Sequence, residues 1–187
     1  LADPASPDVL ARELTSRTRI TGFKDLEVHM FEGTECPAVL DEVGRIRERE
    51  YRRVGAGRDV DRDLDRFDTG DTAYRQLVSF DRAEGELVAM YRAIPCRTAL
   101  ERGGAGALRT NGLFDFSSDF LALDMPRLVE LGRSVVNRNA KRAVQGLFSV
   151  WSGLGALICE WPDIIRFFGN VLVYSDVSDD QLAILLA

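Results

Sequence analysis

Three stretches of the chain alternate apolar and polar residues, the period of a β-strand with one buried face. These stretches are 25–31, 74–80 and 87–94. The second and third flank a polar turn that contains Gly85, so together they predict a β-hairpin. Shorter, more continuously apolar runs predict two further strands, at 128–136 and 171–174.

Apolar residues recur at helical spacing in two longer stretches, which predict helices at 37–53 and 142–159. The first helix carries arginines in its second half, where positive charge suits the negative end of the helix dipole. A short helical turn at 164–168 and a helix that starts at Asp179 complete the set. The helix at 142–159 is expected to bury a stripe formed by Leu147, Val150, Trp151, Leu154, Leu157 and Ile158.

The remaining segments are predicted to be connections. Residues 1–20 are polar and contain two prolines, so we expect a flexible N-terminal arm. Residues 58–73 are acidic and turn-rich, which favours a solvated loop, and the glycine-rich stretch 96–112 predicts a long loop. Residues 113–123 fit either a strand or a helix.

The order of these elements predicts an α/β fold with a mixed central sheet and no internal repeat. At this length, residues 21–187 are expected to form a single domain. The last residues, QLAILLA, have the pattern of the middle of a helix, so we expect the domain to be cut short at its C-terminus.

The amino-acid composition argues against several classes of function. A net charge of −6 argues against nucleic-acid binding, because polyphosphates require a positive field. Cys36, Cys96 and Cys159 are far apart and odd in number, which favours free thiols in a reducing compartment and therefore a cytoplasmic protein. His29 is the only histidine, so neither a histidine-based metal site nor Ser-His-Asp chemistry is expected. It falls on the outward side of its strand and is predicted to be a surface residue.

No segment is expected to span a membrane, because none reaches the ~18 apolar residues that a span requires. The first residues lack the apolar core of a signal peptide.

The stretch 128–155 contains several charged residues that are candidates for a functional site. Its strand carries Glu130 and Arg133, and a basic turn then leads to the N-terminus of a helix, a place that can hold a phosphate-bearing ligand. The basic side chains of this turn are Arg138, Lys141 and Arg142. A merely solvated basic turn stays open as the alternative.

Four groups of polar residues follow one another along the chain: Arg45-x-Arg47-x-x-x-Tyr51, Asp65-x-x-Asp68, Arg92, and Glu130-Leu131-Gly132-Arg133. This ordered set resembles the acyl-homoserine-lactone synthases. It is closer to the hemolysin-like N-acyltransferases that start ornithine- and glycine-lipid synthesis. Both groups belong to the GNAT superfamily, so the resemblance implies a GNAT-like, mostly antiparallel sheet flanked by helices.

The resemblance implies transfer of a fatty or 3-hydroxyfatty acyl group to the α-amine of an amino acid such as ornithine or glycine, which gives a lyso-aminolipid. The donor implied is acyl carrier protein, through its phosphopantetheine, or acyl-CoA. No cofactor stays bound, no metal is required, and membrane contact is expected through the product alone.

One motif departs from the superfamily. Its pyrophosphate loop, Gln/Arg-x-x-Gly-x-Gly/Ala, appears here as Arg138-x-x-Lys141-x-Ala143, with lysine in place of the first glycine. This change favours a carrier-protein donor whose phosphate is bound by the side chains of Arg138, Lys141 and Arg142. The same patch is a candidate landing surface for the acidic helices of the carrier protein.

Glu130 is the first candidate for the general base that takes a proton from the acceptor ammonium, because it interrupts an otherwise buried strand. An ion pair with Arg133 or Arg92 is the alternative. Residues 130 and 133 point to opposite faces of a regular strand, so they share a site only if a β-bulge intervenes. Gly132 permits one.

Two aspartates are the other catalytic candidates. Asp65 and Asp68 either hold the amine or orient Arg92 and Arg47. The candidates for binding substrate are Arg47, Arg92 and Arg133.

Aromatic residues are the candidates for an acyl pocket: Phe114, Phe116, Phe120 and Trp151. Ordinary core packing is the alternative for them. Two other functions stay open for the whole domain. One is a non-catalytic GNAT-like module for binding or assembly, and the other is an acyl-homoserine-lactone synthase or another small-amine acetyltransferase.

Overall fold

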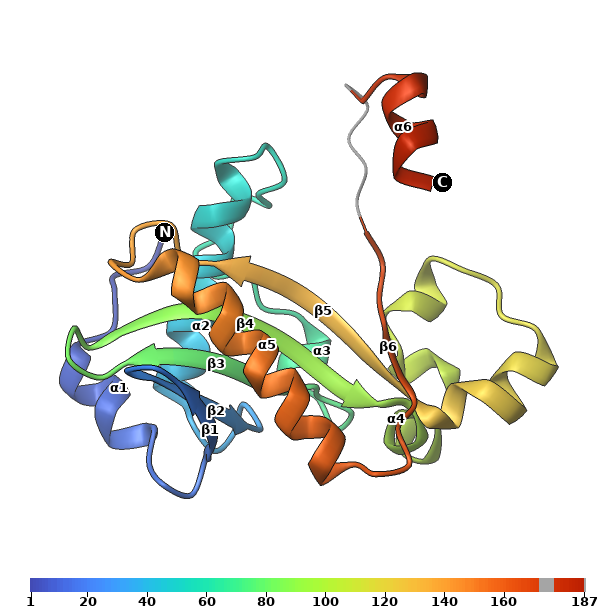
Figure 1. Ribbon diagram of the computed structural model, residues 1–187, viewed down its shortest axis with the longest axis horizontal. Coiled ribbons are helices and arrows are strands. Elements are labelled where there is room, and N and C mark those ends of the chain that lie inside the picture. The colour runs from blue at the N-terminus through green and yellow to red at the C-terminus, as the bar shows by residue number, and fades with distance from the viewer. Residues whose placement is uncertain (172–176, 187) are drawn as a thin grey trace.

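The computed structural model describes residues 1–171 and 177–186 and contains a six-stranded sheet in the order β1-β2-β3-β4-β5-β6 (Figure 1). Neighbouring strands are antiparallel except β5 and β6, which run parallel and pair only along Leu128–Glu130. The predicted mixed, mostly antiparallel sheet is therefore confirmed. The strands are β1 (Arg19–Phe23), β2 (Leu26–Phe31), β3 (Arg75–Asp81), β4 (Glu86–Pro95), β5 (Leu128–Val136) and β6 (Arg166–Phe168).

Helices cover both faces of this sheet (Figure 1). On one face α5 packs Val150 and Leu157 against strand residues such as Leu77. On the other face α1 and α2 share a core with Phe31 and Phe80. The helices are α1 (Pro7–Glu13), α2 (Pro37–Arg52), α3 (Arg66–Thr69), α4 (Cys96–Gly103), α5 (Ala143–Glu160) and α6 (Asp179–Leu186).

The N-terminal residues are packed, so the prediction of a flexible arm over 1–20 differs from the structure. Ser6 caps α1 by accepting a hydrogen bond from the amide of Val9. Leu10 and Leu14 are buried in the core shared with α2. The amphipathic pattern of this short helix is too brief to be recognised without the surface that it covers.

The same packing corrects the prediction for His29, which is buried instead of lying on the surface. Its Nδ1 lies 2.9 Å from Oγ1 of Thr18, and its Nε2 lies 3.2 Å from Glu27. The alternation along β2 is as predicted, but the outward side of this strand is covered by the N-terminal segment. One misassigned segment therefore accounts for both errors.

Helix α5 approaches the sheet through small residues. A β-carbon on Gly146 would lie 2.6 Å from Cγ1 of Val88 and 3.1 Å from Cβ of Ala89. Because this small-residue face is the one that packs, Trp151 and Ile158 of the predicted buried stripe are exposed. Val150 and Leu157 of that stripe are buried, as predicted.

By length and composition alone, α5 is long and apolar enough to cross a membrane, with 18 residues and a mean hydropathy of 1.2. A helix that belongs to a protein core passes the same test, so the prediction that no segment spans a membrane is not overturned. In the structure its small-residue face lies on the sheet.

A pair of glycine variants tests this packing. We expect Gly146→Ala to lower the free energy of unfolding by about 1 kcal/mol, because an overpacking cost of roughly 1–3 kcal/mol outweighs the gain in helix propensity. Gly155, on the open face of α5, has no neighbour within 4 Å of such a β-carbon. We expect Gly155→Ala to raise the free energy of unfolding by up to about 1 kcal/mol. Urea denaturation of both variants measures the difference, and equal effects would contradict the packing described.

Two segments differ from their predictions. The predicted loop 96–112 contains α4 and two short 3₁₀ turns. Residues 113–123, which fit either a strand or a helix, lead into a π-helical turn at Phe120–Asp124. The predicted helical turn at 164–168 is largely strand β6, because its partner β5 lies far away in sequence. The strand predicted at 171–174 falls, from residue 172 onward, outside the described residues. The helix predicted from Asp179 is present as α6.

Candidate functional site

A β-bulge shapes the middle of β5. Arg92 of β4 lies opposite Gly132, and Met90 lies opposite Val135, so β5 has one residue more than β4 in this interval. Arg133 has the left-handed φ of 54° within the bulge. The bulge on which the joint use of Glu130 and Arg133 depends is therefore present, at Arg133 rather than at the permissive Gly132.

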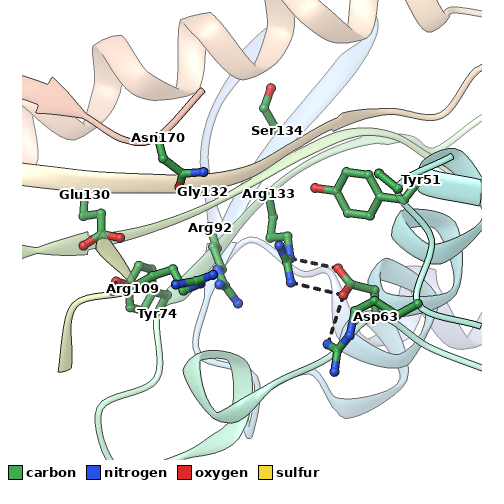
Figure 2. A pocket seen from close by; sticks show the side chains of 12 residues that line it. Tyr51, Asp63, Tyr74, Arg92, Arg109, Glu130, Gly132, Arg133, Ser134 and Asn170 are labelled. Carbon is green, nitrogen blue, oxygen red and sulfur yellow. Dashed lines mark hydrogen bonds and ion pairs between the residues drawn. The ribbon is translucent and has the colours of Figure 1, made fainter. Parts of the chain in front are cut away.

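A pocket of about 390 Å³ lies beside this bulge. Figure 2 shows Glu130 and Arg133 projecting from β5 on the same side, with Tyr51 and Asp63 toward the other end of the pocket. The bulge thus brings residues 130 and 133 to one site. The lining residues are Tyr51, Ala56, Arg58, Asp63, Tyr74, Arg92, Arg109, Glu130, Gly132, Arg133, Ser134 and Asn170.

Glu130 is the carboxyl group of this pocket that has no ion pair within the described residues. The Thr110 amide donates to its Oε1 at 3.1 Å, and the Thr110 hydroxyl donates to its Oε2 at 3.0 Å. Its side chain is only 1% exposed, and this burial raises its pKa above the ordinary range despite the two hydrogen bonds. The alternative of an ion pair with Arg133 or Arg92 is therefore not what the structure shows.

Tyr74 connects Glu130 to its surroundings. Its hydroxyl accepts a 2.9 Å hydrogen bond from the Arg109 amide, one residue before Thr110. Burial, together with the charge of Glu130, raises the pKa of this tyrosine far above its ordinary value, so the phenol stays neutral. Tyr74 therefore fixes the segment that holds Glu130 and is itself no base at physiological pH.

A buried ion network lies behind the pocket and is centred on Asp68. Nη1 of Arg47 donates to Asp68 Oδ1 at 2.9 Å, and Nη1 of Arg92 donates to Oδ2 at 3.0 Å. Gln76 and the Asp65 amide donate to the same carboxylate. Burial raises the pKa of Asp68, but the two guanidinium groups lower it more strongly, to about 2.

The second part of this network reaches the bulge. Arg133 pairs with Asp63 at 2.8 Å and with Asp65 at 3.4 Å. Asp65 also accepts a 2.8 Å hydrogen bond from Arg92. These carboxylates hold the Arg133 side chain while its backbone takes the unusual left-handed conformation.

These contacts show which of the predicted site residues have a structural role. Arg47 and Asp68 are fully buried, are paired with each other and do not line the pocket, so neither is placed to contact substrate. Asp65 orients Arg92, as the structural alternative expects, but its second partner is Arg133 instead of Arg47. The predicted solvated loop 58–73 is wrong for Asp63 and Asp68, because arginines distant in sequence draw both into the interior.

The basic turn before α5 is engaged in ion pairs. Lys141 pairs with Glu84 at 2.6 Å, and Arg142 pairs with Asp81 at 2.8 Å. Arg138 lies 3.9 Å from Glu50 and is largely exposed. The turn is thus neutralised in part, and its role toward a donor phosphate stays a prediction.

The four aromatic residues proposed for an acyl pocket do not form a single group, because Trp151 lies apart from the three phenylalanines. Phe116 stacks with Phe120 at 5.5 Å and neighbours Phe114, beside the α4 core. Trp151 instead contacts Phe148 on the outer side of α5. None of the four lines the pocket beside Glu130, which corrects their joint assignment.

Four residues of the site were not predicted from the sequence: Asp63, Tyr74, Arg109 and Thr110. No local pattern singles out Tyr74, Arg109 or Thr110, because their importance follows from contacts made over 20 residues or more. Asp63 is visible in the acidic stretch, but only the folded bulge identifies it as the partner of Arg133.

Comparisons with known proteins agree with this architecture. Residues 46–151, just over half of the chain, match the family model described as an acetyltransferase (GNAT) domain. A solved aminoglycoside acetyltransferase from an uncultured soil metagenomic sample covers 87% of this chain and 88% of its own, with 14% identity and a TM-score of 0.43, too distant to carry an argument.

Two curated proteins are more similar in sequence. Both are called glycine N(alpha)-acyltransferase, from Bacteroides thetaiotaomicron and Phocaeicola vulgatus, and each is 33% identical over 180 residues. The alignments cover 91% of this chain and 53% and 55% of the two relatives, so the chain spans about half their length. The family match includes the second half of α2, the buried ion network and the bulged strand β5. This chain therefore belongs to the GNAT acyltransferase superfamily.

Proposed function

We propose that this domain transfers a fatty acyl group from a thioester to the α-amine of an amino acid, with glycine as the first acceptor to test. The observation that carries the proposal is Glu130, a buried carboxyl without an ion-pair partner in the described residues, which lines a pocket beside a β-bulge. The name of the two curated relatives supports glycine as acceptor.

Aminolysis of a thioester requires a neutral amine, whereas an α-amine is largely protonated at pH 7. Glu130 removes that proton, and its raised pKa brings it closer to the pH at which a general base is efficient. The nitrogen then attacks the thioester carbonyl carbon, the C–S bond breaks, and the nitrogen gives up its second proton, which goes to the leaving thiolate. Ser134 and Tyr51 are hydroxyl groups of the same pocket that can relay this proton.

The bulge supplies the second element of the mechanism. A bulged residue leaves backbone groups of the strand unpaired, and Gly132, Arg133 and Ser134 line the pocket at this point. An amide aimed at the thioester oxygen stabilises the negative charge that develops there. We therefore place the thioester across the bulge and the acceptor amine toward Glu130.

The donor is proposed to be acyl carrier protein or acyl-CoA, with a fatty or 3-hydroxyfatty chain, and the product a lyso-aminolipid. Arg138, Lys141 and Arg142 remain the proposed contacts for the donor phosphate. Ornithine is the second acceptor to test.

A product assay tests this function. We expect incubation with long-chain acyl carrier protein or acyl-CoA and a panel of amino acids to give an N-acylated amino acid, detected by mass spectrometry. Absence of product with every donor and every amino acid would overturn the proposal.

The hydrogen bonds to Glu130 give a pH-dependent prediction. The Thr110 hydroxyl stabilises the ionised carboxylate, so Thr110→Val is expected to raise the pKa of Glu130 further. The acid limb of kcat/KM then moves to higher pH, by about one unit. Profiles from pH 5 to 9 measure the shift, with Thr98→Val of α4, which does not line this pocket, as the control. An unchanged acid limb in Thr110→Val would exclude this positioning role.

A further inference from the structure

In the described part of the chain, every charged side chain that lines the pocket forms an ion pair except Arg109 and Glu130. Arg58 and Arg133 pair with Asp63, and Arg92 pairs with Asp65 and Asp68. Among the described residues, Arg109 is the pocket arginine whose guanidinium has no carboxylate within 4.0 Å and no hydrogen-bond acceptor. Glu130 is the matching exception on the acidic side.

These two unmatched groups are held next to each other by the chain. The Arg109 amide is bound to Tyr74, and the following residue, Thr110, binds Glu130 through both its amide and its hydroxyl. Figure 2 shows Glu130 and Arg109 at the same end of the pocket, with Tyr74 beside Arg109. As far as the structure describes the chain, this end of the pocket therefore offers a cation and a carboxyl group that have no ion-pair partner.

We infer that Arg109 binds the α-carboxylate of the acceptor and so restricts the enzyme to free α-amino acids. The inference rests on the proposed function, in which the acceptor amine faces Glu130. In an α-amino acid a single carbon atom separates the ammonium and carboxylate groups, so a neighbouring acid and guanidinium match both. Guanidinium binds carboxylates through two parallel N–H···O bonds. A peptide N-terminus or a simple amine lacks the adjacent carboxylate and leaves Arg109 without a partner.

The test compares glycine with glycinamide, which keeps the amine and lacks the carboxylate. We expect Arg109→Gln to raise KM for glycine roughly 10–100-fold, with a smaller effect on kcat, since a charge-assisted pair is lost. For glycinamide the wild type and Arg109→Gln should have similar KM values. Arg109→Lys keeps the positive charge but lacks the two parallel N–H donors of a guanidinium, so it should recover part of the loss with glycine.

Arg127→Gln is the matched control, because Arg127 is an exposed arginine outside the pocket. An unchanged KM for glycine in Arg109→Gln, or an equal loss with glycine and glycinamide, would overturn the inference. Calorimetric titration of glycine into the protein without donor separates this outcome from failure of the proposed function. Loss of glycine binding in Arg109→Gln supports the inference even if no donor is consumed, and equal binding by both proteins refutes it.

Discussion

Replacing Glu130 with glutamine is expected to lower kcat at neutral pH about 100-fold or more, the usual contribution of a general base. Glutamine occupies a similar volume, and the Thr110 hydroxyl can either donate or accept, so both contacts to Thr110 are retained. The loss would therefore report proton transfer rather than a collapsed pocket. Steady-state rates on a chosen acyl donor and glycine measure it.

The same variant should be more stable than the wild type. Because burial raises the pKa of Glu130 in the folded protein, folding disfavours its ionised form. The free energy of unfolding of the wild type consequently falls as pH rises through that pKa, and Glu130→Gln escapes this loss. We expect a higher Tm for Glu130→Gln at pH 8 and a vanishing difference at pH 4. A variant that loses both activity and stability would point to a structural role instead.

Replacing Asp68 with asparagine is expected to lower the free energy of unfolding by about 3–5 kcal/mol, because it leaves Arg47 and Arg92 buried without their shared counter-charge. Chemical denaturation measures the change. Asp71→Asn is the matched control: Asp71 is exposed, lies three residues further on, and should change stability by less than about 0.5 kcal/mol. Similar small effects of both substitutions would contradict a buried network as the support of the pocket.

The network also has a defined dependence on pH. With a folded-state pKa of about 2, below its ordinary value of 3.8, Asp68 contributes stability that is complete above about pH 4 and is lost as pH falls toward 2. Asp68→Asn lacks this titration, so its stability should vary less with pH in that range.

The spacing of apolar residues was sufficient to predict the bounds of an element where that spacing is regular within the element. Strand β5 and helix α2 lie within one residue of their predicted bounds, and the hairpin of β3 and β4 is where alternation places it. The bulge in β5 could be anticipated from the conflict between Glu130 and Arg133 on one strand, with a glycine between them. The bulged conformation itself is taken by Arg133 and not by that glycine, which the sequence does not indicate.

Contacts between distant segments explain the failures. His29 is buried because the N-terminal segment, through Thr18, covers its strand. Asp68 is buried because Arg47 and Arg92 neutralise it. Trp151 is exposed because glycines allow the opposite side of α5 to approach the sheet. In each case the residue has the polarity that the sequence shows, but its environment depends on partners that local spacing does not identify.

The central claim is that Glu130 takes the proton from the acceptor amine, and the pH dependence of Glu130→Gln tests it most directly. At alkaline pH the amine becomes neutral in solution and no longer requires a base. The rate of the variant should therefore rise steadily with pH and approach that of the wild type toward about pH 10, while the wild type changes much less. Parallel profiles, with the same fold-difference between the two proteins at pH 7 and pH 10, would contradict the claim.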